Sequence, residues 1–481
     1  MVGHGGYDSL VVGAGPNGLA AAITLAMAGR SVCVVDARRN PGGCAGSDEG
    51  TLPGYLHDTF SAVFPMAVDT PFFSGLSPEE FPVEWIVPPA ALAHPFDDGS
   101  CLLLSRSIDS SIQAFGEDAD PYAQCIRPFA EAWKELSAEI LSPPFHVPRH
   151  PLLLMRFGLK GMWPVSVTAR RLFRTDKVRA LFAGLGAHSI MPLDHPLTSS
   201  FALFMCASAH QTGWPIARGG AGTIGSALAA HLKNLGAEIL LSHPVNSMKD
   251  IPGSRSVFFD LTPGQILAVA RERIPTGVSR QLARYRSGPG AFKVDWALDA
   301  PIPWRAGECC RASVVHLGGS YEEIARSERL AAEGSDPDVP FVILAQPSLF
   351  DPSRAPQGKH TAWAYCHVAN GSKRDLTSRI EGQIERFAPG FKKRILSRRV
   401  LPPTVLQGLN ANLIGGDIAG GANTFCQIFF RPIRSLNPYA LSRDGLYICS
   451  SSSPPGGGVH GMCGFNAARK ALDGGMSHRK P

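Results

Sequence analysis

Patterns that mark a disulfide framework, a structural metal site or a membrane-spanning helix are missing from this sequence. Its 11 cysteines are odd in number and irregularly spaced, no C-x-x-C pair occurs, and Cys309 and Cys310 are adjacent. This usage argues against a disulfide framework, a zinc site and a redox dithiol, and it favours a reducing compartment. No apolar run approaches the roughly 18 residues that span a bilayer. We therefore expect no bound metal and no transmembrane helix.

A large excess of one charge is also missing. The net charge is +6, from 46 basic and 40 acidic residues that are dispersed along the chain. So small an excess does not indicate a nucleic-acid partner. Nothing before Tyr7 resembles a signal or transit peptide, so we expect a soluble cytoplasmic protein. The 481 residues, 44% of them hydrophobic, predict more than one domain and a large apolar interior.

A glycine motif near the start of the sequence is its most informative feature. A short apolar run ends at Val12 and leads into G-x-G-x-x-G spacing between Gly13 and Gly18. An alanine-rich helix, a second strand over 31–35 and Asp36 come next in order. The glycines permit a tight turn and close approach of a pyrophosphate, the helix N-terminus faces the phosphates, and the acid accepts hydrogen bonds from ribose hydroxyls. This stretch predicts a dinucleotide-binding βαβ unit.

The residues just after Asp36 indicate which dinucleotide is bound. Arg38 and Arg39 precede the pair Gly42-Gly43. An acid succeeded by arginine and paired glycines is similar to the pattern of FAD-binding oxidoreductases, whereas the arginines alone would suit the 2′-phosphate of NADP. The glycine pair favours FAD. From this part of the chain we assign to the cofactor Gly13, Gly15, Pro16, Asn17, Gly18, Asp36, Ala37, Arg38, Gly42 and Gly43.

Two later stretches are expected to return the chain to the same cofactor. A glycine-rich helix start within 217–237 is succeeded by a strand, and backbone near Val245 is then expected to meet adenine. A strand over 445–449, a Ser/Pro/Gly loop and a helix from His460 form an arrangement whose helix dipole stabilises negative charge at a reduced flavin. The cofactor contacts predicted here are Val245, Ser451, Gly458, Val459, Gly461 and Met462.

The order of these stretches predicts an α/β protein with a discontinuous Rossmann-like FAD-binding domain and an inserted α+β substrate domain. We expect the FAD-binding domain at 1–68, 213–274 and 444–481, and the substrate domain at 69–212 and 275–443. Strand candidates of the substrate domain lie at 291–298, 312–317, 339–346 and 360–367. A helical lid region is expected at about 120–183, with one helix over 120–141.

Basic residues are concentrated in the lid region at 155–179. They are Arg156, Lys160, Arg170, Arg171, Arg174, Lys177 and Arg179, interspersed with apolar residues. A solvated face of a lid helix is one interpretation, and peripheral contact with a membrane or a lipid substrate is the other. A second basic run at 392–399 is interpreted as solvated surface.

With both ends considered, the chain resembles the phytoene desaturase-related FAD oxidoreductases, in the branch that contains the pyridine nucleotide-disulphide oxidoreductase-domain protein two and its bacterial relatives. The matching stretches are VVGAGPNGLAAA, DARRNPGG, GGAGTIGSALA, AQPSLFDPSRAP, QIERFAPGF and GLYICSSSSPPGGGVHGMCGFNAA. The resemblance implies FAD and a substrate domain of the amine oxidase and carotenoid desaturase type. It fails in two places: only Cys44 stands where the family name implies a cysteine pair, and Ser451 and Ser452 replace an acid after the last strand.

Candidate catalytic residues come from the same resemblance. In related amine oxidases a substrate-domain lysine holds a water at the flavin N5, and Lys293 is its best match; a surface lysine on an edge strand is the competing interpretation. His460 would donate a hydrogen bond or move a proton; the competing interpretation is a structural loop residue. His57 would face the flavin, or it would lie on a surface loop. Five aromatic residues are expected either to line an apolar pocket or to pack in the core: Phe425, Phe429, Phe430, Trp296 and Trp304.

The sequence therefore predicts a FAD-dependent oxidoreductase of desaturase or oxidase type. It would transfer hydride between the flavin and a small apolar, isoprenoid- or lipid-like substrate. Two alternatives stay open, an NAD(P)H-dependent flavin reductase or saturase and a FAD-stabilised scaffold without turnover. No second complete G-x-G-x-x-G unit is present for a nicotinamide cofactor, which weighs against the reductase.

Overall fold

Five parallel strands form the sheet that begins with the glycine motif. In a computed structural model that describes residues 6–477, their order is β16 (Leu446–Ile448), β10 (Ser254–Phe259), β1 (Tyr7–Val12), β2 (Val32–Val35) and β9 (Glu238–Leu240). Val12 lies opposite Val35 on one side and Phe259 on the other, so three strands end at the same edge. Because the strands come from three separate stretches of chain, this α/β unit is discontinuous, as the sequence predicts.

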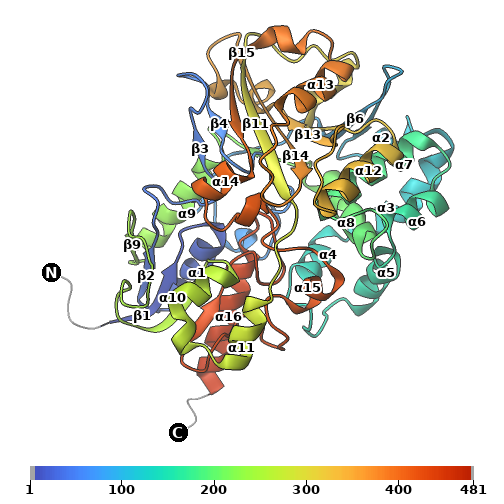
Figure 1. Cartoon of the computed structure of the whole chain (residues 1–481). Helices are drawn as coiled ribbons and strands as arrows, with labels where there is room; N and C mark the ends of the chain where they lie inside the picture. Colours follow the sequence, from blue (N-terminus) through green and yellow to red (C-terminus); the bar gives the residue numbers. More distant parts are fainter. Residues whose placement is uncertain (1–5, 478–481) are drawn as a thin grey trace.

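Helices cover both faces of this sheet, which explains its continuous apolar strands. One face packs on α1 (Pro16–Met27), α9 (Gly222–Asn234) and α16 (Met462–Ser477), and the other on α10 (Pro263–Ala270) and α11 (Thr276–Ala283). Figure 1 shows α10 and α11 in front of the sheet, with α1 and α16 beside it. The ends of β1, β2, β10 and β16 therefore lie between two helical layers.

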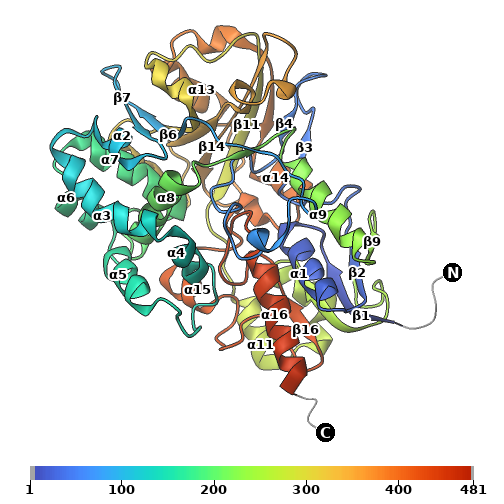
Figure 2. The same ribbon diagram turned by 180° about the vertical axis from the view of Figure 1, so that it is seen from behind.

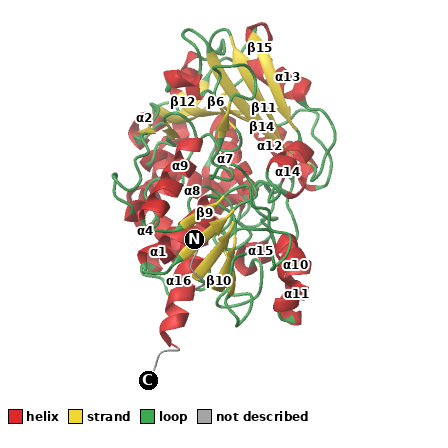
Figure 3. Cartoon of the chain, turned by 90° about the vertical axis from the view of Figure 1, so that its left-hand side faces the viewer, coloured by secondary structure: helices red, strands yellow, loops and turns green. Residues whose placement is uncertain are grey.

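A second, mixed sheet of seven strands forms the other end of the molecule (Figure 3). Its order is β15 (Ile395–Leu401), β11 (Gly290–Leu298), β14 (His360–Val368), β13 (Val342–Ala345), β12 (Ala312–Leu317), β6 (Ala90–Pro95) and β7 (Cys101–Leu104). The strands pair antiparallel except for β12 and β6. All four strand candidates of the substrate domain lie in this sheet. The numbered domain boundaries stay a prediction.

Helices α2 to α8 pack together beside the two sheets. They are α2 (Ile108–Ile112), α3 (Ala119–Glu131), α4 (Trp133–Ile140), α5 (Pro151–Gly161), α6 (Val165–Leu172), α7 (Asp176–Gly186) and α8 (Thr198–Gln211). The single helix expected over 120–141 is wrong: the chain leaves helical geometry at Ala132 (φ −101°, ψ 34°) and divides it into α3 and α4. Figure 2 shows α5 on the outside of this group, beside α4 and α15 (Phe425–Phe430).

The basic run at 392–399 is not simply solvated surface. Its second half belongs to β15, an edge strand paired with β11. Arg398 bonds to Glu381 at 2.9 Å, and Arg399 bonds to Asp48 at 2.6 Å. Its sequence, ILSRRVL, has no clean alternation of apolar and polar residues, so the cluster of charges obscured the strand.

The remaining elements are short. They are the helix α14 (Pro403–Leu409), the pair β3 (Ser47–Asp48) and β4 (His57–Asp58), and the pair β5 (Trp85–Ile86) and β8 (Ile216–Ala217). Helix α12 (Tyr321–Ala332) packs on β14, and α13 (Thr377–Phe387) packs on β12 and β14. Among residues 6–477, no helix is long and apolar enough to cross a membrane.

Candidate functional site

A cavity of about 1030 Å³ is lined by residues of both sheets and of the helical layer. Its residues from the parallel sheet come directly after β1, β2, β10 and β16, at the carboxyl edge where open α/β sheets bind ligands. Its residues from the mixed sheet include Ala291 and Lys293 of β11, and those from the helical layer include Phe157 and Phe204. The cavity therefore reaches both sheets and the helical layer.

Most of the residues predicted to bind the cofactor line this cavity. They are Gly13, Gly15, Pro16, Asn17, Asp36, Ala37, Arg38, Gly43, Val245, Ser451, Gly458 and Val459. Lys293 and His460 line it as well. Four predicted contacts, Gly18, Gly42, Gly461 and Met462, lie behind its wall and support its backbone. A Cβ on Gly18 would lie 2.0 Å from the Gly13 carbonyl oxygen, so this glycine packs beneath the turn and does not face the ligand.

The turn after β1 has the geometry of a phosphate cradle. Gly13 has a φ of 110°, a conformation that suits glycine. The side-chain amide of Asn17 donates to the Ser451 hydroxyl at 3.4 Å, while its oxygen is buried without a hydrogen-bond partner among residues 6–477. An orphaned buried amide oxygen at the start of α1 indicates that a ligand completes this site.

The acid after β2 is held in position by backbone donors. Ala14 N–H donates to one oxygen of Asp36 at 2.6 Å, and Arg38 N–H donates to the other at 2.7 Å. The Arg38 guanidinium donates to the Gly43 carbonyl at 2.8 Å. An oriented carboxylate suits ribose hydroxyls and repels a 2′-phosphate, so this arrangement disfavours NADP.

Asp260 is a cavity residue that sequence analysis did not assign. It comes directly after β10, accepts a hydrogen bond from Gly18 N–H at 3.1 Å and lies under the glycine turn. Burial, with a smaller contribution from Asp36, raises the pKa of Asp260 to about 7. Its position at the end of a buried strand, level with Asp36, is the signal that would have found it.

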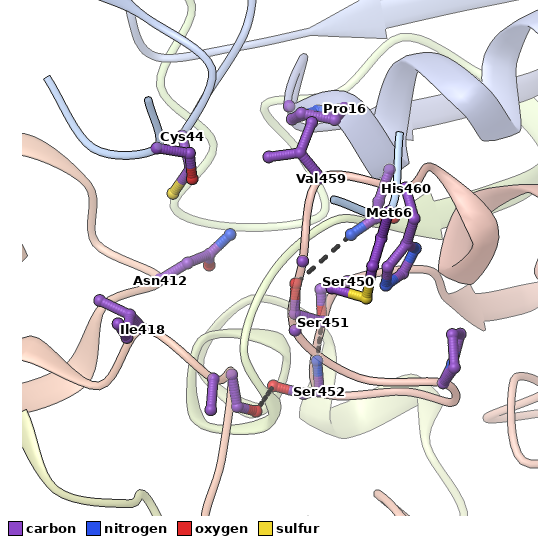
Figure 4. Close-up of a pocket in the computed structure, with 18 of the residues that line it drawn as sticks. Pro16, Cys44, Met66, Asn412, Ile418, Ser450, Ser451, Ser452, Val459 and His460 are labelled. Atoms are coloured by element: carbon purple, nitrogen blue, oxygen red, sulfur yellow. Dashed lines mark hydrogen bonds between the residues drawn. The ribbon is translucent and has the colours of Figure 1, made fainter. Parts of the chain in front are cut away.

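The loop between β16 and α16 brings His460 to the cavity. Figure 4 shows Ser450 to Ser452 on one side of the pocket and His460 beside Met66. Met462 N–H donates to His460 Nδ1 at 3.0 Å, so the neutral ring carries its proton on Nε2, which has no partner among the described residues. Burial lowers the pKa of His460 to about 4. At neutral pH this residue is thus an uncharged hydrogen-bond donor, which suits it to bind an acceptor and not to carry protons.

Lys293 lies on an interior strand, since β11 pairs with both β14 and β15. Its side chain is 3% exposed and forms an ion pair with the fully buried Asp295, two residues along the same face. The ammonium nitrogen lies 5.6 Å from the centre of the Trp363 ring. Burial lowers the pKa of Lys293 and raises that of Asp295 to about 6. The structure therefore excludes the exposed edge-strand interpretation and places an ionisable pair at the cavity wall.

The rest of the cavity is predominantly apolar. Its wall includes Leu154, Phe157, Met162, Ile190, Leu197, Phe201, Phe204, Met205, Val314, Ile343, Ile428 and Phe429. Of the five aromatic residues proposed for this role, only Phe429 contributes. Trp296 and Trp304 are buried elsewhere and donate to Glu381 and Gln346, each at 3.0 Å.

His57 and Cys44 lie near the cofactor turn without forming a reactive pair. His57 is buried outside the cavity lining and shares a hydrogen bond of 2.7 Å with Thr51, so it neither lines the cavity nor lies on the surface. Cys44 is the one cysteine of residues 6–477 that lines the cavity. Burial raises its thiol pKa to about 11, and Asn410 donates to its sulfur at 3.1 Å. A protonated lone thiol does not support dithiol chemistry.

Comparison with known proteins identifies relatives on both sequence and structure. Residues 11–73 match the NAD(P)-binding Rossmann-like domain family. The pyridine nucleotide-disulfide oxidoreductase domain-containing protein 2 of Rattus norvegicus is 25% identical, over 96% of this chain and 92% of its own. All-trans-zeta-carotene desaturase of Myxococcus xanthus is 24% identical, over 94% and 90% of the two chains.

The fold has solved counterparts among amine oxidases. A triple mutant of putrescine oxidase superposes with a TM-score of 0.63 at 15% identity, covering 98% of this chain and 99% of its own. Together with the sequence relatives, this similarity confirms the resemblance drawn from the sequence motifs. Over nearly its whole length the chain is thus similar to phytoene desaturase-related oxidoreductases, and it shares the fold of putrescine oxidase.

Proposed function

We propose that the protein is a FAD-dependent oxidoreductase that transfers hydride between the flavin and an apolar, isoprenoid- or lipid-like organic substrate. The observation that carries this proposal is a single cavity whose wall changes from glycine turns and carboxylates to aliphatic and aromatic side chains. A dinucleotide at one end and an apolar molecule at the other would share this space. A relative whose name specifies a carotene desaturase supports the same substrate class.

The residues present suit FAD as the cofactor. Gly13 and Gly15 would approach the pyrophosphate, Asp36 would accept from the ribose, and the neutral His460 ring would donate to an acceptor at the far end. The unpartnered Asn17 oxygen and His460 Nε2 are two buried polar groups that such a ligand would satisfy. When bound, FAD supplies the two-electron redox chemistry.

Lys293 and Asp295 provide proton handling at the apolar end of the site. Forming a carbon–carbon or carbon–nitrogen double bond removes a proton as well as a hydride, and the proton needs an acceptor where water is scarce. Because burial lowers the Lys293 pKa, the Lys293–Asp295 pair would exchange this proton directly or through a held water, with Asp295 stabilising the ammonium form. Trp363 and Tyr365 of β14 enclose the same region and exclude solvent.

The first test is anaerobic titration of the purified protein, with the absorbance of oxidised flavin as the readout. We expect no rapid bleaching by NADPH and bleaching by apolar alkenes or amines of the substrate class. Rapid bleaching by NADPH would redirect the proposal to a flavin reductase. Purified protein that neither retains flavin nor binds added FAD would overturn the cofactor assignment.

The second test replaces the ionisable pair. Lys293→Met is expected to lower the rate of flavin reduction by about 10²-fold, within the range of general acid–base effects. Since Lys293→Met leaves Asp295 buried alone, the variant Lys293→Met/Asp295→Asn serves as its control for folding. Retention of the wild-type reduction rate and pH profile by a folded, flavin-loaded Lys293→Met would remove Lys293 from the proposed mechanism.

A further inference from the structure

Helix α5 presents an apolar stripe to solvent. Leu152, Met155 and Leu159 recur every three to four residues, so they share one side of the helix, and the exposed Met162 and Trp163 extend the row past its end. Leu152 is 71% exposed and Leu159 is 65% exposed. Single exposed apolar side chains are ordinary on a protein surface, but a contiguous row of this kind marks an interaction site.

The stretch of chain around α5 is rich in basic residues. Residues 141–193 contain eight lysines and arginines and a single acidic residue, Asp176. Within the part of the chain that the structure describes, Arg156, Lys160 and Arg171 have no carboxylate within 4.0 Å. Arg171 instead lies 5.1 Å over the ring of Trp163. Basic residues that lack an acidic partner thus flank the apolar stripe on the same surface.

The opposite side of α5 belongs to the cavity. Leu154, Phe157, Gly158 and Gly161 line the apolar chamber, and Met162, just past the end of the helix, lines it at the border with the exposed stripe. Figures 1 and 2 both place α5 at the periphery, with α4 between it and the body of the molecule. One helix therefore separates the apolar chamber from the exposed stripe.

We infer that this surface, defined by Leu152, Met155, Leu159, Met162 and Trp163 with Arg156, Lys160 and Arg171, docks the protein on an anionic lipid surface. We name it the α5 face. Its apolar row would enter the boundary between headgroups and acyl chains while the cations contact anionic headgroups. Trp163, with Arg171 over its ring, has the amphipathic character found at membrane interfaces.

The charge pattern favours a lipid surface over a second copy of the chain. In a two-fold dimer the same patch meets itself, so the α5 faces would bring the unpaired cations of both copies together at an apolar contact. Anionic headgroups neutralise those cations instead. Peripheral attachment is the form of binding expected, because no helix within residues 6–477 can span the bilayer. Docking would also deliver a membrane-dissolved substrate to the cavity, and only that step rests on the proposed function.

Flotation with lipid vesicles tests this inference without any activity measurement. The flavin-loaded protein is mixed with vesicles of phosphatidylcholine alone, or of phosphatidylcholine and phosphatidylserine in equal amounts. We expect flotation with the anionic vesicles and roughly tenfold weaker binding to the neutral ones. High salt should weaken the anionic binding in proportion to the charge involved.

Two pairs of matched variants locate the surface. Leu152→Glu/Leu159→Glu should reduce binding to anionic vesicles by at least about tenfold, whereas Val339→Glu/Leu396→Glu, also at exposed apolar positions, should not. Arg156→Gln/Lys160→Gln should weaken binding, whereas Lys392→Gln/Lys393→Gln, at exposed lysines elsewhere, should leave it unchanged.

Three outcomes would overturn the inference. The first is absence of flotation for the wild type at low salt, and the second is an equal loss of vesicle binding in the α5 variants and the control variants. The third is a wild-type dimer, detected by light scattering, that dissociates in the α5 variants alone although those variants still float. The last result would make the α5 face an interface between copies. Bleaching by apolar substrate in a variant that no longer floats would separate failure of docking from failure of the proposed function.

Discussion

Asp260 shows how a single residue can set the pH range in which this site works. Its carboxyl group lies beneath the turn where the pyrophosphate is expected, and its pKa is raised to about 7 because the group is buried near Asp36. A neutral carboxyl tolerates a phosphate and can donate to it, whereas an ionised carboxylate repels it. Protonation of Asp260 and binding of an anionic ligand should therefore be linked.

We expect FAD affinity of the apoprotein to fall as pH rises from about 6 to about 8, because Asp260 ionises over this range. Asp260→Asn keeps an oxygen that accepts from Gly18 N–H but cannot ionise. Its dissociation constant, measured by quenching of flavin fluorescence, should be nearly flat over the same range. Parallel pH profiles for the two proteins would show that Asp260 does not face the phosphates.

Residues within one local motif were predictable, and residues that meet through the fold were not. The turn, Asp36 and the paired glycines lie within a single stretch, where spacing along the chain determines their geometry. Asp260 reaches the same turn from more than 200 residues away, and Asn412 joins it there by donating to the Asp260 carbonyl at 2.8 Å. Only the order of the strands brings them together.

At the scale of elements, the contact between α1 and α16 supports the cofactor turn. A Cβ on Gly464 would lie 1.8 Å from the Asn17 carbonyl oxygen, so the two helices approach as closely as glycine allows. Asn17 is also a cavity residue at the start of α1. Helix α16 thus packs directly against the glycine turn from behind.

Gly464→Ala should therefore destabilise the protein and weaken FAD binding together. Forcing the helices apart is expected to lower the free energy of unfolding by about 3 kcal/mol. Gly382→Ala is the control, because a Cβ there meets nothing within 4 Å and the exposed centre of α13 should gain about 0.5–1 kcal/mol. Denaturant unfolding would measure the stability of each variant, and flavin retention would measure its FAD binding. A Gly464→Ala variant with wild-type stability would disprove the close contact.

Element prediction succeeded where periodicity was clean and failed where another feature obscured it. The strand at 312–317 agrees with β12. The break at Ala132 comes four residues after Pro128, but alanine itself favours helix, and just beyond the break Trp133 packs against Phe204 of α8. Tertiary contacts determine such a boundary.

At the scale of the whole molecule, the large apolar interior holds several histidines in their neutral form. Burial lowers the pKa of His57, His94, His188, His210, His316 and His460 below the usual value. Asp260 and Asp295 are shifted in the opposite sense, since burial raises their pKa values to about 7 and about 6. As pH falls from 6.5 to 4, the buried histidines therefore lower the free energy of unfolding while the two carboxyl groups raise it. The histidines are more numerous.

We therefore expect the protein to lose stability in mild acid. Unfolding lets each buried histidine take up a proton below its ordinary pKa of about 6.5, so the stability it contributes is complete above that pH and falls as pH drops toward its lowered folded pKa, which is about 4 for His94 and His460. His94→Gln should reduce the slope of unfolding free energy against pH by up to about 1.4 kcal/mol per pH unit. Denaturant midpoints measured from pH 7 to 5 would check this; a flat wild-type profile would mean that the carboxyls cancel the histidines or that the imidazoles are solvated.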